Sequence, residues 1–461
     1  MRTSELVLKA RYVFPVDGPV IRDGCVHVQA HRIIHVGPSA GTPTLDLGNA
    51  AIVPGFVNAH THLDLSGLRA KELGGSSFVN WLRAVIAARR EMDAKAVHHA
   101  VGRGIDACLA AGTTLVGDIS SGGMSWKPLA RSPLRATVFC ELLGLGPDRA
   151  THTARAARGW LAPMAVAPDS TEPSHGAENE LAFDDATPLD PLPLVPATAT
   201  PRRLMPGLSP HAPYSTHPLL YDLAGRWARR SSAPLCSHLA ETREEQQLIR
   251  DRAGPLRSFL ESIGAWSDAW RPPGPSPLDY LRRPDTEPAH WLIAHGNYLS
   301  DDDIATIRDQ GSAISGQPSA VGNPHSGRRA VAYCPRTHFY FGHATHPYPK
   351  LLAAGVVVCI GTDSLASTPT LSVLDELRFV RRRDAGLPGS ALLHIATLAG
   401  AWALGRERDC GSLSPGKYAD LAVIRLPPDR DEADPHELLL QSDQPVTGTM
   451  ISGQWVYRLQ G

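Results

Sequence analysis

The sequence predicts a (β/α)8 TIM barrel accompanied by a small β-sandwich domain built from both ends of the chain. In the middle of the chain, eight strand-like apolar runs alternate with helical stretches, which is typical of parallel strands joined by helix crossovers. The 461 residues accommodate one large barrel with an accessory domain. Apolar residues at 43% and charged residues at 20% are those of an ordinary folded protein, which excludes a disordered or fibrous chain.

The predicted β domain begins with residues 1–51. Between residues 5 and 36, short apolar runs are broken by glycine, proline and aspartate, as in a small antiparallel sheet. Residues 410–461, at the other end of the chain, show the same pattern in the strand-like segments 417–425 and 446–458. Because both ends have the same character, we expect them to form one β domain.

The predicted barrel occupies residues 52–409. Its eight strand-like runs are 52–60, 113–119, 136–144, 204–211, 234–240, 290–295, 330–335 and 356–363. Residues 165–201 are rich in proline, alanine, threonine and aspartate, and residues 315–328 in glycine, serine and proline. Such segments do not pack as helices, so we expect two inserted surface loops on the barrel face away from the active site.

Polar or ionisable side chains close nearly every one of these runs. They are His60, Asp118, Glu141, His211, His238, His295 and Asp363. The carboxyl ends of barrel strands meet on one face, where enzymes of this fold carry their active sites. This coincidence is the strongest indication that the chain is an enzyme.

Four of the side chains near strand ends predict a metal site. His60 and His62, at positions i and i+2, project from one face of the first strand, although His-x-His alone also fits ordinary polar residues. His238 and Asp363 close strands five and eight, which a barrel brings together, although Asp363 alone also fits a helix cap. Three imidazoles and a carboxylate suit one divalent ion, Zn²⁺ first and Fe²⁺ as the alternative.

Two further residues indicate acid–base chemistry beside this ion. Glu241 comes three positions after His238, so the chain can turn its carboxylate over the metal as a general acid/base. A glutamate in the first turn of a helix is its structural alternative. His295 closes strand six and suits a hydrogen bond to the water that reacts, and a purely structural histidine is the alternative there.

The net charge, the length of the apolar runs and the cysteine usage limit the possible binding partners and cellular compartments. The 45 Lys and Arg residues balance 46 Asp and Glu, so no basic surplus is present to bind nucleic acid. No stretch approaches the roughly 18 apolar residues of a membrane helix, and the first residues lack a secretory signal. Seven scattered cysteines without a C-x-x-C pair predict buried thiols in a reducing compartment. We therefore expect a cytoplasmic protein with a small-molecule substrate.

Five motifs in order, PGFVNAHTHLDLS, SPHAPYS, HLAET, AHGN and GVVVCIGTDSLAS, resemble the metal-dependent amidohydrolase superfamily. The likeness covers nearly the whole chain and points to the branch of cytosine deaminases, S-adenosylhomocysteine deaminases and chlorohydrolases. It implies a mononuclear site, since residues 204–215 lack the lysine that two-metal relatives carry. It also implies that Asp363 accepts a proton from water, Glu241 shuttles protons and His295 orients the water. Relatives often form dimers, so a homodimer is compatible with the resemblance, although no feature of this sequence indicates one.

The resemblance also implies substrate contacts. His211 stands where related deaminases use the histidine of HAPY, and Trp81 ends an F-x-x-W element that resembles the lid of adenosine-type deaminases. Arg89 and Arg90 stand where some relatives carry an acidic residue. Arginine there resembles aminodeoxyfutalosine deaminases, whose substrate ends in a benzoate, although a solvated helix face is the alternative. Glu141, at the end of strand three, either faces the ligand or caps a loop.

We therefore expect a hydrolytic deaminase of an aminated purine-type ring, with aminodeoxyfutalosine or S-adenosylhomocysteine as the leading substrates. One alternative is dechlorination or deamination of triazines or other heterocycles, guanine and cytosine included, because the same nucleophile attacks any carbon bearing a leaving group. A non-catalytic metal-binding scaffold is the other. The presence of Glu241 and His295, which metal binding does not need, speaks against the scaffold.

A histidine-rich segment, CPRTHFYFGHATHP, follows strand seven where relatives often show C-P-x-S-N. It brings His338, His343 and His346, which is compatible with a reshaped ligand pocket, and the H-x-x-H of the last two is compatible with a second metal. The segment contains no carboxylate, and its one cysteine, Cys334, is not adjacent to this H-x-x-H, so solvent-facing histidines are the expected arrangement.

Overall fold

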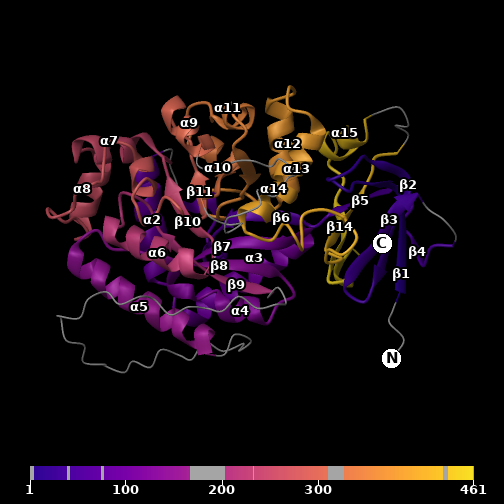
Figure 1. Cartoon of the computed structure of the whole chain (residues 1–461), viewed down its shortest axis with the longest axis horizontal. Helices are drawn as coiled ribbons and strands as arrows, with labels where there is room; N and C mark the ends of the chain where they lie inside the picture. The colour runs from indigo at the N-terminus through magenta and orange to yellow at the C-terminus, as the bar shows by residue number, and fades with distance from the viewer. Residues whose placement is uncertain are drawn as a thin grey trace.

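The structure is a computed structural model that describes residues 5–38, 42–73, 77–166, 203–231, 233–309, 327–428 and 434–459. Two sheets organise it, a parallel one that closes into a barrel and a mixed one beside it (Figure 1). The loops predicted at 165–201 and 315–328 fall almost entirely outside the described residues.

Eight parallel strands, paired in sequence order, form the barrel and confirm the predicted fold. They are β6 (Phe56–Thr61), β7 (Thr113–Ser120), β8 (Arg135–Leu142), β9 (Leu204–Pro210), β10 (Leu235–Leu239), β11 (Trp291–His295), β12 (Arg329–Tyr333) and β13 (Val357–Ile360). A parallel bridge between Thr61 and Asp363 joins the ends of the first and last strands. This bridge brings both ends of the strand series to the same point of the barrel mouth.

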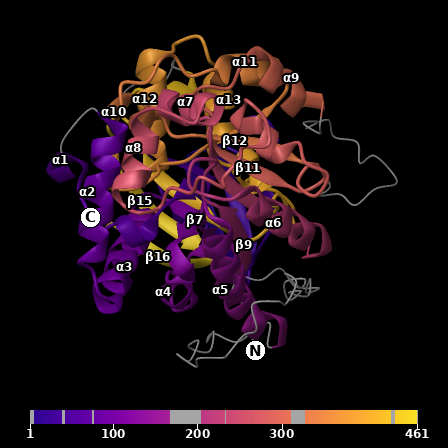
Figure 2. The ribbon, with the colours of Figure 1, turned by 90° about the vertical axis from the view of Figure 1, so that its left-hand side faces the viewer.

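Helices surround the barrel, as the view from the end opposite the mixed sheet shows (Figure 2). They are α1 (Ala70–Leu73), α2 (Phe78–Arg90), α3 (Ala94–Ala110), α4 (Trp126–Ala130), α5 (Pro147–Val166), α6 (Pro218–Ser231), α7 (Arg243–Asp251), α8 (Pro255–Ser262), α9 (Asp301–Asp309), α10 (Pro335–Tyr340), α11 (Tyr348–Ala353), α12 (Val373–Arg383), α13 (Gly389–Ile395), α14 (Leu398–Ala403) and α15 (Pro435–Leu440), with short 3₁₀ turns η1 (Leu63–Leu65), η2 (Ser121–Gly123) and η3 (Pro277–Leu281). Several helices begin at a side-chain N-cap. Ser77, Asp93 and Thr242 each accept a backbone N–H in the first turn of the helix that follows.

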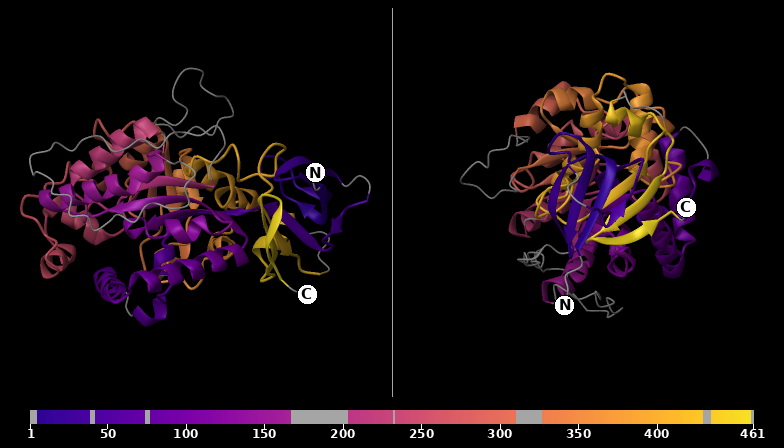
Figure 3. Two further views of the ribbon diagram at one scale, coloured as in Figure 1. Left: turned by 90° about the horizontal axis from the view of Figure 1, so that it is seen from below. Right: turned by 90° about the vertical axis from the view of Figure 1, so that its right-hand side faces the viewer.

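The two ends of the chain form one mixed sheet in the order β16-β15-β14-β5-β1-β2-β3, with β4 beside β1. Its strands are β1 (Glu5–Val13), β2 (Ile21–Gln29), β3 (Arg32–Pro38), β4 (Leu45–Asp46), β5 (Ala50–Pro54), β14 (Leu421–Arg425), β15 (Val446–Ile451) and β16 (Gln454–Arg458). The N-terminal and C-terminal halves meet where β5 pairs antiparallel with β14. Figure 3 shows the indigo and yellow strands side by side, at the end of the barrel away from α7 and α8.

The single strand predicted over 52–60 is two strands. Residues up to Pro54 belong to the mixed sheet, and the barrel strand starts at Phe56. Gly55 joins them at a point with no room for a side chain, because a Cβ there would lie 2.1 Å from Oγ1 of Thr114. The domain limits predicted from the sequence stay a prediction. The structure places β5 in the mixed sheet, on the N-terminal side of this junction.

Buried contacts fix the mixed sheet to the base of the barrel. Arg135 of β8 donates to Asp420, next to β14, at 2.5 Å, and its guanidinium lies 3.8 Å from the ring centroid of Tyr418. All seven cysteines are buried and without a disulfide, as predicted. In the part of the chain that the structure describes, no helix combines the length and the apolar character needed to cross a membrane.

Candidate active site

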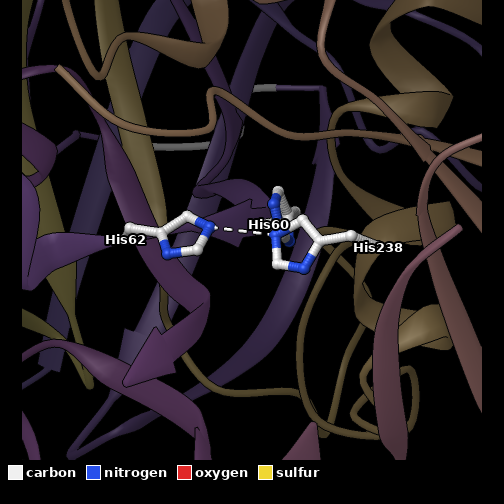
Figure 4. Close-up of side chains that lie close together, drawn as sticks. All are labelled: His60, His62 and His238. Atoms are coloured by element: carbon white, nitrogen blue, oxygen red, sulfur yellow. Dashed lines mark hydrogen bonds between the residues drawn. The ribbon is translucent and has the colours of Figure 1, made fainter. Parts of the chain in front are cut away.

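Three histidines converge at the mouth of the barrel. His60 comes from the end of β6, His62 from the residue just after it, and His238 from β10. Each offers a ligand atom within 4.8 Å of the others, and Nε2 of His62 lies 3.1 Å from Nε2 of His238 (Figure 4). The i, i+2 spacing in β6 and the neighbouring barrel strands therefore produce the grouping predicted from the sequence.

The hydrogen bonds of these imidazoles suit a metal ion. Nδ1 of His238 lies 2.9 Å from the carbonyl oxygen of His211, which can only accept, so Nδ1 carries the proton and Nε2 keeps its lone pair. Nε2 of His60 is buried without a hydrogen-bond partner, an arrangement that costs about 1–3 kcal/mol unless a ligand satisfies it. Burial lowers the pKa of His238 to about 4 and that of His60 and His62 well below 6.5, which favours the neutral imidazoles that bind metals.

Asp363 faces the same point from the end of β13. Its Oδ1 lies 3.6 Å from Nε2 of His62 and 4.0 Å from Nε2 of His60. Ser367 donates a hydrogen bond to Oδ2 at 2.8 Å, so Oδ1 remains directed toward the imidazoles. Asp363 is not a helix cap, because the next helix begins at Val373 with Ser372 as its cap. Burial raises the pKa of Asp363 to about 7.

Glu241 is buried beside the histidines, in the turn between β10 and α7. The helix begins only at Arg243 after the cap Thr242, so the first-turn alternative for Glu241 is wrong. Glu245 holds this turn in place, since its carboxylate accepts the backbone N–H of Ala240 at 3.2 Å and that of Glu241 at 2.7 Å. Burial, and then the nearby charge of Asp363, raise the pKa of Glu241 well above its usual value.

His295 lies opposite Glu241 at the end of β11. Its Nε2 is 3.5 Å from Oε1 of Glu241, and its ring centroid is 5.2 Å from that of His60. The backbone of His295 has φ +67°, in the left-handed region that non-glycine residues rarely adopt. Burial and the neighbouring imidazoles lower its pKa well below 6.5, so the ring is neutral at physiological pH.

His211 and Glu141 lie next to the histidine cluster on the adjacent strands β9 and β8. Nδ1 of His211 is 2.6 Å from Oγ of Ser215, and its Nε2 is 3.8 Å from Oε1 of Glu141. Burial, and then the charges of Asp64 and Asp118, raise the pKa of Glu141 to about 8. A protonated Glu141 is therefore a hydrogen-bond donor in the wall of the site.

A cavity of about 780 Å³ opens over the site, and every side chain predicted for substrate contact lines it. Its outer wall is apolar and comes mainly from α2 and α8. Trp81 is buried in this wall, and its Nε1 donates to the carbonyl oxygen of Ala366 at 2.7 Å. That bond ties α2 to the segment just after Asp363.

The two arginines of α2 differ in their surroundings. Arg89 is half-buried; its Nε is buried without a hydrogen-bond partner, and its Nη2 lies 3.4 Å from Sδ of Met124. Its positive charge partly offsets the effect of burial, which raises the pKa of Asp64 to about 6 and that of Glu141 to about 8. Arg90 is exposed at the rim, where the solvated-face alternative describes it better.

Several residues that shape the site were not predicted from the sequence. They are Glu245, Asn297 and Ser367. Asn297 donates to the backbone carbonyl of Glu241 at 2.9 Å. Glu245 had a usable signal, because it lies four residues after Glu241 in a helical first turn. No sequence signal distinguished Ser367, because several serines follow the eighth strand-like run.

The loop histidines differ from the expectation of a solvent-facing group. His346 is only 3% exposed, and His338 and His343 are half-buried. Each binds a different partner: Nε2 of His338 lies 2.7 Å from the Ala344 carbonyl oxygen, Nδ1 of His343 lies 3.2 Å from the Tyr298 hydroxyl, and Nε2 of His346 lies 2.8 Å from the His295 carbonyl oxygen. The reason is that the loop folds back onto β11 rather than extending into solvent.

A (β/α)8 barrel with three imidazoles, a carboxylate and a buried glutamic acid at its mouth defines a hydrolase of the metal-dependent barrel class. The sequence model of the amidohydrolase family matches residues 51–456. The chain belongs to this family, whose members generally bind a divalent metal ion, and it is a hydrolase acting on carbon–nitrogen bonds in cyclic amidines.

Relatives of this chain are named deaminases. The aminodeoxyfutalosine deaminase of Deinococcus radiodurans is 30% identical over 374 residues, which cover 77% of this chain and 74% of that protein. The 5-methylthioadenosine/S-adenosylhomocysteine deaminase of Moorella thermoacetica is 26% identical over 92% of this chain and 86% of its own. The crystal structure of Helicobacter pylori aminofutalosine deaminase has the same fold, with a TM-score of 0.74 at 22% identity over 98% of this chain and 100% of that one.

Proposed function

We propose that the protein is a metal-dependent deaminase that hydrolyses the exocyclic amine of an adenine-type ring and releases ammonia. The observation that carries this proposal is the buried pair of Glu241 and His295, 3.5 Å apart and facing the three-histidine cluster. A scaffold that only bound metal would need neither. The two deaminases that resemble this chain over most of its length support the same reaction.

We propose that His60, His62, His238 and Asp363 hold one divalent ion, with Zn²⁺ favoured over Fe²⁺ because the set combines three neutral imidazoles with one carboxylate. The unpartnered Nε2 of His60 supports this assignment. Such an ion, when bound, lowers the pKa of water from about 15.7 toward 7 and so provides a nucleophile at neutral pH.

Side chains of the protein carry out the proton transfers of the reaction. The Asp363 carboxylate accepts a proton from the water, and His295 orients that water with its neutral imidazole. Glu241 holds a proton at neutral pH and gives it to the ring nitrogen beside the carbon under attack. A C–O bond forms at that carbon, and Glu241 takes the hydroxyl proton of the adduct and passes it to the amine. The C–N bond then breaks, ammonia leaves and a ring carbonyl remains, while the proton on Asp363 returns to Glu241.

For the far end of the substrate, we propose a carboxylate bound by Arg89, as in an aminodeoxyfutalosine-type nucleoside. Arg89 lines the cavity, its Nε has no hydrogen-bond partner among the residues that the structure describes, and a guanidinium suits a carboxylate. His211 and Trp81 contact the ring side, and Arg90 lies at the rim. S-adenosylhomocysteine, which also carries a carboxylate, is the second candidate.

The substrate proposal predicts a selective effect of Arg89→Gln. Ammonia release is measured with a panel of adenine nucleosides that carry or lack a carboxylate, together with a chlorinated and an aminated triazine. Loss of a charge-assisted contact of about 1.5–3 kcal/mol raises KM for carboxylate substrates roughly 10- to 150-fold, with little change in kcat. The matched control Arg90→Gln shifts KM by no more than about twofold, as an exposed substitution should.

Other outcomes of this panel assign other functions. Equal effects of Arg89→Gln on carboxylate-bearing and carboxylate-free nucleosides contradict the proposed carboxylate contact but keep the deaminase. Turnover of a triazine in preference to every nucleoside contradicts the nucleoside substrate and favours the triazine alternative.

The carboxylate contact also predicts a pH dependence of KM. Below about pH 8 Glu141 is protonated, so the charge of Arg89 is available to the substrate. As the pH rises through 8, Glu141 ionises and competes for Arg89, so KM for a carboxylate substrate increases. In Glu141→Gln the group cannot ionise, and we expect KM to stay flat between about pH 7 and 9. The same increase in the variant would show that another group causes it.

A further inference from the structure

His346 lies in the loop between α10 and α11 and contacts the backbone of His295, which the proposed function uses. Its Nε2 is 2.8 Å from the carbonyl oxygen of His295. Its Nδ1 accepts the backbone N–H of Tyr348 at 2.9 Å, so Nδ1 carries no proton. Nε2 must therefore carry it, and the imidazole is a donor to the His295 carbonyl.

Besides its two hydrogen bonds, the ring of His346 makes a packing contact through its face. Its centroid lies 4.1 Å from that of Tyr333, and the ring of Tyr333 stacks in turn on Tyr348 at 5.0 Å. With 3% exposure, His346 has almost no contact with solvent. The donor is thus presented to His295 from a fixed position.

The backbone at His295 needs such support. His295 and Gly296 both have positive φ, of +67° and +63°, and the first is not a glycine. The turn directs the His295 carbonyl out of the barrel ladder and toward the loop. It also sets where the His295 imidazole points, with Nε2 at 3.5 Å from Oε1 of Glu241.

We propose that His346 is a positioning residue for the deamination, because its N–H holds the left-handed turn that aims the His295 imidazole at Glu241. This proposal rests on the proposed function for its kinetic consequence, but the geometry it assigns to His295 can be tested without turnover. Without the donor, the buried carbonyl loses its partner and the turn can relax toward an ordinary backbone conformation.

Three variants of His346 test the role of the N–H. Phenylalanine keeps a ring and removes both nitrogens. Asparagine can still accept from Tyr348 but is too short to reach His295, whereas glutamine can place an amide N–H near the position of Nε2. We expect kcat to fall about 10- to 100-fold in His346→Phe and His346→Asn, with KM little changed, because a small misplacement of a reacting group has that effect. His346→Gln should recover most of the loss.

The control is His338→Phe, because His338 lies in the same loop and its Nε2 also binds a backbone carbonyl, that of Ala344, at 2.7 Å. It has no hydrogen bond to His295, and phenylalanine keeps a ring to pack against His346, whose centroid lies 5.5 Å away, so kcat should stay within about twofold of the parent enzyme. Thermal unfolding and metal content are measured for every variant. Purely structural support would lower the melting temperature of His346→Phe and leave kcat unchanged, which overturns the proposal.

A crystal structure of His346→Asn gives a readout that does not depend on turnover. We expect the φ of His295 to leave the left-handed region, or its Nε2 to move away from Glu241. An unchanged His295 in that structure overturns the proposal, as does a kcat of His346→Gln as low as that of His346→Asn. If the parent enzyme deaminates no compound of the panel, the proposed function fails, and the crystal structure still decides the role of His346.

Discussion

Replacing Glu241 with glutamine is expected to lower kcat at least about a hundredfold while leaving metal content intact, since loss of a general acid/base has effects of this size. Glutamine has nearly the same shape as glutamic acid, and the contacts of Glu245 and Asn297 with residue 241 involve only its backbone. The substitution therefore removes a proton donor and little else. Ammonia release and elemental analysis of the same preparation measure the two quantities.

The matched control is Glu244→Gln, three positions further along, in the first turn of α7. Glu244 is half-buried outside the cavity, so we expect its kcat to stay within about twofold of the parent enzyme. Unchanged turnover in Glu241→Gln would remove Glu241 from the proton path. Loss of metal in that variant would instead place the carboxylate among the ligands.

The barrel was predictable because its strands are buried on both faces and are therefore continuous apolar runs with a polar residue at the end. The same property explains the error at 52–60. Every residue of β5 and β6 is buried, so no change of pattern marks the passage from one sheet to the other. Gly55 was the only local sign, and a glycine alone does not indicate a change of sheet.

The proposed ligands and Glu241 were predictable because each stands at the end of a barrel strand, where the fold fixes its position. His346 was not, and expecting it to face solvent was wrong. Its burial depends on contacts with Tyr333 and His295, which lie 13 and 51 positions away and belong to other elements. Sequence spacing carries no information on such contacts.

The sequence did not distinguish Arg89 from Arg90, but the two arginines lie on differently buried faces of α2. Both arginines line the cavity and each belongs to a row of residues spaced by four. Trp81 and Val85 are buried in the row of Arg89, whereas Leu82 and Ile86 in the row of Arg90 are only half-buried. Arg90 is one position further along the helix and exposed at the rim. Helical spacing alone does not distinguish the two arginines, and only their burial in the structure shows that Arg89 lies deeper in the cavity wall.

Removing one proposed ligand is expected to have the largest effect of all. In His238→Ala one of the three imidazoles is lost, and we expect metal affinity to fall by more than about 100-fold, since even partners outside the ligand set contribute 10- to 100-fold. Turnover should become undetectable, because water without the ion has a pKa near 15.7. Elemental analysis after dialysis and ammonia release measure the two effects.

His152→Ala serves as the control, since His152 is an exposed histidine of α5 that does not line the cavity, so its replacement should affect neither quantity. Comparison with Glu241→Gln then makes the test specific. One variant removes a ligand and keeps the acid, and the other removes the acid and keeps the ligands. The proposed site requires metal to be lost in the first and retained in the second, and a His238→Ala protein that keeps its full metal content contradicts it.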